Sequence, residues 1–468
     1  MKIQINAQVN PFNKAACLVA ILMLSVTAPA QTFTTLYAFT GGSDEGVPQA
    51  SLILSGNTLY GTTSGGLNNS GIQGYGSVFA INTDGSGYRT LHEFSGGDGG
   101  NPYDSLILSG NTLYGTTSFG GDYAWGTVFA INTDGTGFTN LYSFTGGNDG
   151  GSPDDSLILS GNTLYGTAGD GLYGNGTVFA ISTNGTSFTN LYNFTSSIMN
   201  GEYGDTNTDG GAPEAGLILS GNTLYGTTYQ DGIYGNGTVF AINTDGTGFT
   251  NLWNFAVFNG WGPTASLLLS GNNLYGTTTG GGTNSAGTVF ALNTNGTDFT
   301  VVHTFVGYSD GGSPHDALIL SGNELYGTAG GGPNGNGTVF AMNTNGTGFG
   351  TPYDFSESVS LPSGLFTNYD GAAPYGSVIL SGNTLYGTTQ IGGVYGNGTV
   401  FSLSLPAQLT IVHAGKKVTL TWPTNSIYAG LTLQAAGQIT GTFTNVPRAN
   451  SPYSVSITGT QRFFRLYP

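Results

Sequence analysis

The chain has 468 residues, a formal net charge of −17, only 7% charged residues, 82 glycines and one cysteine, Cys17. All 25 acidic residues lie between Asp44 and Asp370, a region whose one basic residue is Arg89. Such an acidic surface repels phosphate backbones, which argues against nucleic acid as a partner, and a single cysteine cannot form a disulfide within the chain.

The N-terminal segment has the pattern of a secretory signal. Lys2 and Lys14 precede an apolar run over residues 15–26, and the sequence Ala-Pro-Ala at 28–30 supplies the small residues of a cleavage site. The run is shorter than the roughly 20 apolar residues of a membrane-spanning helix. We therefore expect residues 1–30 to be removed, which leaves a secreted or cell-surface protein without a membrane span.

Residues 31–405 repeat one unit seven times. Each unit has four short apolar runs separated by Gly- and Asn-rich turns, which predicts four antiparallel strands joined by hairpins. In the third run of the second unit, Val128 and Ala130 would face one side and Phe129 and Ile131 the other, so each sheet must be covered on both faces. The glycine of the recurring Leu-Tyr-Gly core, Gly115 in the second unit, is expected to let a neighbouring sheet approach closely. The core recurs every 50 to 60 residues, with its tyrosine at Tyr60, Tyr114, Tyr165, Tyr225, Tyr275, Tyr326 and Tyr386.

Four-stranded sheets that stack face to face around an axis form a β-propeller. One run of the fourth type, at residues 33–39, precedes the first unit, and the seventh unit lacks that run. The N-terminal strand is therefore expected to complete the last blade. The predicted fold is all-β, a kelch-like propeller of seven four-stranded blades over residues 31–405.

One recurring pair of motifs resembles a known family. Leu-Tyr-Gly-Thr-Thr followed by Gly-Thr-Val-Phe-Ala, as at residues 113–117 and 126–130, is similar to the tandem GloVer repeat of secreted bacterial proteins that carry varied C-terminal anchors. The resemblance covers residues 33–405 and implies no assigned activity. The final Arg-Leu-Tyr-Pro lacks the apolar span and basic tail of a membrane-type sorting signal.

Residues 406–468 differ in character from the repeats. Short alternating runs surround a single tryptophan, Trp422, and five basic residues occur there without an acidic one. This pattern predicts a small β-sandwich of the fibronectin type III kind. Its positive charge suits contact with an acidic surface, and an inert terminal cap is the alternative.

The connections before the first strand and after the second strand of each unit are expected on one face of the propeller. Every connection before a first strand contains the pattern Asp/Asn-x-x-x-Pro. A ring of carboxylates would suit Ca²⁺, the one cofactor considered, which prefers six to eight oxygen ligands. Alternatively, each Asp bonds backbone N–H groups of its own loop. The candidate metal ligands are Asp98, Asp149, Asp209, Asp310 and Asp370.

Aromatic side chains on the same face are candidates for glycan binding, because sugar rings stack on aromatic faces. Trp125 and Trp261 interrupt the repeat, whereas the repeated tyrosines have the alternative role of wedging between blades. The candidate ligand-binding residues are Trp125, Trp261, Tyr173, Tyr234 and Tyr395.

Two long connections, at residues 195–212 and 356–373, also carry acidic residues. A glycosidase needs two carboxylates at a set separation, and Asp209 with Asp370 is the candidate pair, supplemented by Glu202 and Asp205. We expect a monomeric, non-catalytic propeller that binds extracellular polysaccharide or another cell-surface component. The alternatives are a polysaccharide-degrading enzyme, either a glycoside hydrolase or a lyase, and a structural or adhesive surface protein.

Overall fold

The structure is a computed structural model. The predicted signal segment, Glu202 and Trp422 lie outside the residues it describes. Contacts divide the chain into two compact units, one of Phe33–Leu380 with Leu385–Ser402 and a second that includes Leu403–Pro468. The described residues are 32–65, 74–200, 204–360, 366–405, 410–414, 417–421, 432–436, 444–446, 453–456 and 463–467.

The described residues form strands and turns and contain no helix, which confirms the all-β prediction. Among them there is accordingly no helix of the length and hydropathy that a membrane crossing requires.

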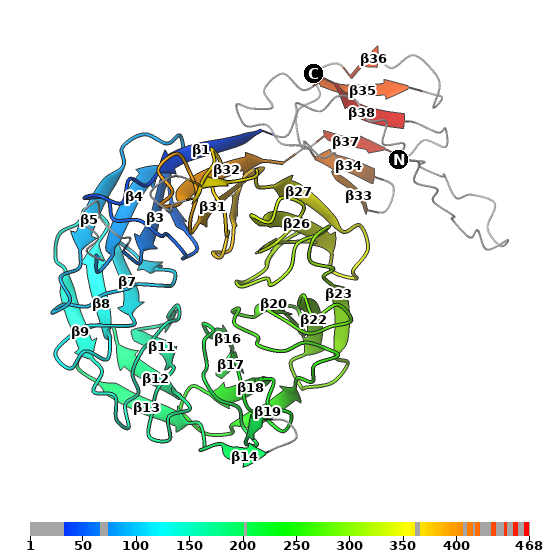
Figure 1. The fold of residues 1–468 in the computed structure, drawn as a ribbon. Helices are drawn as coiled ribbons and strands as arrows, with labels where there is room; N and C mark the ends of the chain where they lie inside the picture. Colours follow the sequence, from blue (N-terminus) through cyan, green and yellow to red (C-terminus); the bar gives the residue numbers. More distant parts are fainter. Residues whose placement is uncertain are drawn as a thin grey trace. The chain divides into compact units, whose positions relative to one another are not determined.

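Seven four-stranded antiparallel sheets are arranged as the blades of a propeller (Figure 1), which confirms the predicted architecture. We number the blades 1 to 7 by their inner strands, which lie nearest the centre of the ring in Figure 1. The inner strands are β2 (Ile53–Ser55), β6 (Ile107–Ser109), β10 (Ile158–Ser160), β16 (Ile218–Ser220), β20 (Leu268–Ser270), β24 (Ile319–Ser321) and β30 (Ile379–Ser381).

The second and third strands of each blade form its longest hairpin. The second strands are β3 (Thr58–Thr63), β7 (Thr112–Thr117), β11 (Thr163–Ala168), β17 (Thr223–Thr228), β21 (Asn273–Thr278), β25 (Glu324–Ala329) and β31 (Thr384–Thr389). The third strands are β4 (Ser77–Asn82), β8 (Thr127–Asn132), β12 (Thr177–Ser182), β18 (Thr238–Asn243), β22 (Thr288–Asn293), β26 (Thr338–Asn343) and β32 (Thr399–Ser404). In blade 2 the hairpin pairs Thr112 with Asn132 and Thr117 with Thr127.

The outer strands of blades 1 to 6 are β5 (Arg89–Glu93), β9 (Thr139–Ser143), β13 (Phe188–Asn193), β19 (Thr250–Asn254), β23 (Thr300–Thr304) and β27 (Gly350–Asp354). The sheet of blade 7 has the strand order β1-β32-β31-β30, so its outer strand is β1 (Phe33–Ala38). Two short hairpins, β14 (Ile198–Asn200) with β15 (Gly204–Thr206) and β28 (Val359–Ser360) with β29 (Phe366–Thr367), lie in the long connections.

The hydrophobic core lies between neighbouring blades. Phe129 and Ile131 of β8 pack with residues of blade 1, including Tyr60. Val128 and Ala130 pack on the other side with residues of blade 3, including Phe179. The two faces of β8 are therefore both buried, as the apolar pattern predicts, because each blade covers the faces of its neighbours.

Gly115 in β7 makes room for a side chain of its own blade. A Cβ at this position would lie 2.6 Å from Phe129 Cζ and 2.8 Å from a methyl carbon of Leu106. The sequence suggests instead that this glycine lets a neighbouring sheet approach. That interpretation is wrong, because the ring of Phe129, paired opposite Gly115 in the sheet, fills the space.

Aromatic side chains on the outer strands stack from each blade to the next. His92 of β5 lies 3.6 Å from the ring of Phe138 at an interplanar angle of 8°. The same contact joins Tyr353 of β27 to Phe33 of β1, with centroids 4.1 Å apart. His92 therefore has a packing role, and it occupies the position that Tyr or Trp takes in most of the other outer strands.

The C-terminal unit contains two three-stranded antiparallel sheets. One has the order β33 (Thr410–Ala414), β34 (Lys417–Thr421), β37 (Tyr453–Ser456), and the other has β36 (Thr444–Asn445), β35 (Thr432–Ala436), β38 (Phe463–Tyr467). The fibronectin type III-like fold of this module stays a prediction.

Candidate functional site

One face of the propeller carries the exposed apolar side chains. We call it the loop face: it consists of the entry loops, which lead from an outer strand to the inner strand of the next blade, and the middle loops, which join second and third strands. Among the side chains whose exposure the structure describes, 20 large apolar ones are exposed, and all of these lie in the two kinds of loop. The 20 residues are Tyr75, Tyr103, Phe119, Tyr123, Trp125, Leu172, Tyr173, Ile198, Ile233, Tyr234, Val257, Phe258, Trp261, Val306, Tyr308, Val359, Tyr369, Ile391, Val394 and Tyr395.

The repeated Asp of the entry loop is a hydrogen-bond acceptor within its own blade connection. Asp149 accepts bonds from the Tyr142 hydroxyl at 2.9 Å, the Thr145 N–H at 2.9 Å and the Thr145 hydroxyl. In blade 2, Asp98 accepts from the N–H and hydroxyl of Ser95 and pairs with His92. These contacts match the loop-capping alternative of the sequence analysis.

The predicted catalytic pair occupies this same capping position. Asp209 is 4% exposed and accepts bonds from Tyr192 and Thr195. Asp370 is 5% exposed, and its partners are Tyr353 and Ser356. Each carboxylate is thus used by its own loop. Asp205 lies in β15.

The predicted calcium ligands are similarly engaged. Asp310 accepts bonds from the N–H groups of Val306 and Gly307 and pairs with His303. Across the described part of the chain, no group of three or more His, Cys, Asp or Glu side chains is placed to hold a metal ion. A calcium site at these aspartates stays a prediction.

The two predicted tryptophans cover loop glycines. Trp125 is 41% exposed, and its ring would lie 2.3 Å from a Cβ added at Gly146, in the entry loop of blade 3. Trp261 is 36% exposed and exchanges backbone hydrogen bonds with Gly280 in the middle loop of blade 5. Each ring therefore packs on one side and presents the other to solvent. The two lie in separate loops.

The predicted tyrosines Tyr173, Tyr234 and Tyr395 are all exposed in middle loops, two residues before the Asn that precedes the third strand. Tyr75, like Trp125, is separated from its third strand by one glycine, and it lies against Gly96 and Gly100 of the next entry loop. The wedge position is therefore that of Tyr75 and Trp125.

Carboxylates near the axis of the ring form a cluster that the sequence analysis missed. Asp316 of blade 6 accepts a bond from the Ser377 N–H of blade 7 at 2.7 Å and from the Ser51 hydroxyl of blade 1 at 2.6 Å. Asp104 of blade 2 accepts from the Ser156 N–H of blade 3 at 2.7 Å. These side chains join successive blades at the start of their inner strands.

Burial and mutual repulsion keep protons on these carboxyls. Burial, together with the charge of Asp316, raises the pKa of Asp104 to about 7. Burial and the nearby Asp104 raise the pKa of Asp155 well above its ordinary value. In the entry loop of blade 3, burial and Glu214 raise the pKa of Asp154 to about 7. At neutral pH this region thus contains carboxyl groups that can donate as well as accept protons.

The sequence pattern that could have revealed this cluster appears when the seven entry loops are compared. The second residue after the loop proline is Ala, Asp or Gly. Alanine at this position is buried in blades 1, 4 and 5. The aspartates are Asp104, Asp155 and Asp316.

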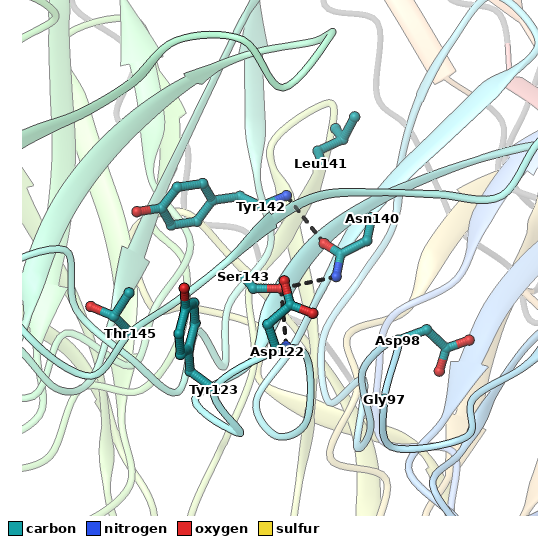
Figure 2. Close-up of a pocket in the computed structure, with 9 residues that line it drawn as sticks. All are labelled: Gly97, Asp98, Asp122, Tyr123, Asn140, Leu141, Tyr142, Ser143 and Thr145. Atoms are coloured by element: carbon teal, nitrogen blue, oxygen red, sulfur yellow. Dashed lines mark hydrogen bonds between the residues drawn. The ribbon is translucent and has the colours of Figure 1, made fainter.

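A cavity of about 600 Å³ lies at the outer edge of blade 2 (Figure 2). Gly97 and Asp98 line it from the entry loop, and Asp122 and Tyr123 from the middle loop. Residues 140–143 of β9 and Thr145 complete the lining. The Asn140 amide donates to the Ser143 hydroxyl at 3.1 Å, and that hydroxyl accepts from the Asp122 N–H at 3.3 Å (Figure 2).

Solved structures with a similar fold share little sequence with the chain. The nidogen/laminin complex matches with a TM-score of 0.36 and 17% identity, over 55% of this chain and 81% of that chain. An oligogalacturonate lyase in complex with manganese gives 0.45 and 11%, over 75% and 86%. The GH74 enzyme of Niastella koreensis gives 0.46 and 15%, over 84% of this chain and 59% of that one. These are likenesses of fold alone. No curated protein sequence matches the chain.

The family resemblance of the repeats is confirmed independently. The sequence model of the Gloeobacter/Verrucomicrobia repeat matches residues 65–207 and 203–368, which together make up more than half of the chain. The matched ranges run from the middle loop of blade 1 to the entry loop of blade 7. The chain belongs to the Gloeobacter/Verrucomicrobia repeat family.

Proposed function

We propose that this protein is a secreted or cell-surface propeller that binds extracellular glycan, or another surface component, through its loop face. The observation that carries the proposal is the confinement of all 20 exposed large apolar side chains of the described residues to that face. Twelve of the 20 are aromatic. Aromatic faces stack on the C–H faces of sugar rings, and nearby carboxylates accept bonds from sugar hydroxyls.

The charge of the propeller favours neutral ligands. Residues 33–402 contain Arg89 as their one Lys or Arg, and it lies on the outer strand β5. Anionic polymers would meet repulsion without a compensating basic cluster. Neutral polysaccharides meet none.

The repeats supply matched substitutions for the test. Asn occupies the position of Trp125 in blades 3, 4, 6 and 7, and Gly occupies that of Trp261 in blades 1, 2, 3, 4 and 6. Trp125→Asn and Trp261→Gly therefore remove an exposed ring and install a residue that sibling blades already accommodate. Retention of the unfolding temperature would verify that both variants fold.

The assay is native affinity electrophoresis of residues 31–468 in gels cast with neutral or acidic polysaccharides, each run with Ca²⁺ and with a chelator. Retardation by a neutral polysaccharide, reduced by the two substitutions, is the expected result. Equal retardation of the wild type and both variants would remove the tryptophans from the site. Free migration in every gel would overturn glycan binding and leave a structural or adhesive role.

A second candidate function is polysaccharide cleavage, and one observation favours it. Asp154, whose pKa is raised to about 7 by burial and by Glu214, has the environment that a general acid needs at neutral pH. A cleared zone in the gel that disappears in Asp154→Asn and Glu214→Gln would support this activity. Clearing that persists in both variants would exclude these two carboxyls.

A further inference from the structure

The middle loop of blade 2 departs from its siblings at one position. Asp122 occupies the place that an exposed aliphatic residue takes in blades 3, 4 and 7, namely Leu172, Ile233 and Val394. A tyrosine follows in all four loops, and in blade 2 it is Tyr123. Since the sibling side chains are exposed, packing does not require a carboxylate here.

The Asp122 carboxylate is free to bind a ligand. Its backbone N–H is fixed by the Ser143 hydroxyl, but its side-chain oxygens accept no hydrogen bond from the described residues. Tyr123 beside it is 59% exposed. Both line the cavity of blade 2, whose volume of about 600 Å³ falls within the roughly 300–1,000 Å³ typical of ligand sites.

Exposed aromatic residues are also concentrated around this blade. Tyr103, Phe119, Tyr123 and Trp125 lie in the entry and middle loops of blade 2. Among the side chains whose exposure the structure describes, no other blade has more than two exposed aromatic ones in these loops. Phe119 stacks with Tyr75 of blade 1 at a centroid distance of 6.4 Å and an interplanar angle of 3°. A polymer held in the cavity would thus find further stacking surfaces nearby.

We propose that the cavity beside Asp122 and Tyr123 is a subsite for one neutral sugar unit of a polysaccharide. The C–H face of the sugar stacks on the Tyr123 ring, and two adjacent hydroxyls donate to the Asp122 carboxylate. Asp98 places a second carboxylate in the same lining, and no basic residue is present there, so uronic and sulfated sugars are disfavoured. This assignment rests on the proposed glycan-binding function and gives it a location.

The test measures retardation of the wild type and variants in gels cast with hydroxyethyl cellulose, xyloglucan, galactomannan, laminarin or polygalacturonate. Asp122→Leu installs the sibling residue, and Tyr123→Ala removes the ring while Tyr123→Phe keeps it. Glu357→Gln is the matched control, because Glu357 is an exposed carboxylate on the loop face in the entry loop of blade 7. Circular dichroism and unfolding temperature verify the fold of each variant.

We expect Asp122→Leu and Tyr123→Ala each to weaken binding of a neutral polysaccharide by about tenfold or more, and Tyr123→Phe and Glu357→Gln to leave it within about twofold. Unchanged binding in Asp122→Leu and Tyr123→Ala, with loss in the tryptophan variants, would overturn this subsite but not the proposed function. Binding of polygalacturonate alone would also overturn it. A wild type that binds nothing would overturn both.

Discussion

The buried carboxyl of Asp104 near the axis makes the stability of the propeller depend on pH, and one substitution should remove this dependence. Asp104 has an ordinary pKa of 3.8, which burial and the charge of Asp316 raise to about 7. The folded state therefore binds more protons than the unfolded state between pH 4 and 7. The free energy of unfolding falls as the pH rises through this window, and it levels off above the folded pKa.

Asp104→Asn removes this dependence because an amide is uncharged at every pH. A shift of about three pKa units corresponds to at most about 4 kcal/mol at about 1.4 kcal/mol per unit. Because Asp104 retains some exposure and its titration is coupled to that of Asp316, we expect about 1–3 kcal/mol of stabilisation above pH 7.5. The Asn side chain keeps one acceptor oxygen, for the Ser156 N–H, but its NH2 group replaces the oxygen that accepts from the Ser105 N–H, and this lost bond offsets part of the gain.

The assay is thermal unfolding of the wild type and Asp104→Asn between pH 4.5 and 8.5. The two curves should nearly coincide at pH 4.5 and diverge as the pH rises, with the variant the more stable. Asp134→Asn removes the same charge from an exposed turn where Asp134 accepts bonds from Thr136, and it should give no such gain. A difference between Asp104→Asn and the wild type that does not change with pH would refute the reasoning.

Two further substitutions test the packing of the blades. Gly115→Ala places a Cβ 2.6 Å from Phe129 Cζ, so we expect overpacking to lower the free energy of unfolding by about 1–3 kcal/mol. The measurement is the midpoint of chemical denaturation, which should fall. An unchanged midpoint would show that the Phe129 ring moves aside without cost. Tyr192→Phe removes the hydroxyl that donates to Asp209 at 2.8 Å, and we expect a loss of about 1–2 kcal/mol in the same assay. Full stability of that variant would mean that the two Thr195 donors alone hold the loop.

The parts of the fold that could be predicted are those that every blade repeats. The alternation that puts Val128 and Phe129 on opposite faces is local, and it requires a cover on both sides whatever the rest of the chain does. Because the same unit recurs seven times, a closed ring of blades is the arrangement in which every sheet is covered on both faces. The role of Gly115 was missed because a glycine in a strand shows that space is needed without showing which side chain fills it.

The candidate site was harder to predict because its residues are distant in sequence. Asp104 and Asp316 lie in blades 2 and 6, so no local pattern places their carboxylates near each other. The repeated entry-loop aspartates were the more conspicuous candidates, yet their regularity reflects a shared structural task. Asp209 holds its own loop as Asp149 does, with a tyrosine hydroxyl and a threonine as donors.

In a ring of near-identical blades, a position that is the same in every blade serves the shared fold, and a position that differs in one blade is open to a role of its own. The middle loop of blade 2 has two such differences: Asp122 where three blades have an aliphatic residue, and Trp125 where four have asparagine. Asp122 lines the cavity at the outer edge of that blade, and Trp125 lies three residues further along the same loop. A substitution at the surface of one blade leaves the packing between blades intact, so a symmetric propeller can gain a single binding site in this way. A search for the ligand should therefore begin at blade 2.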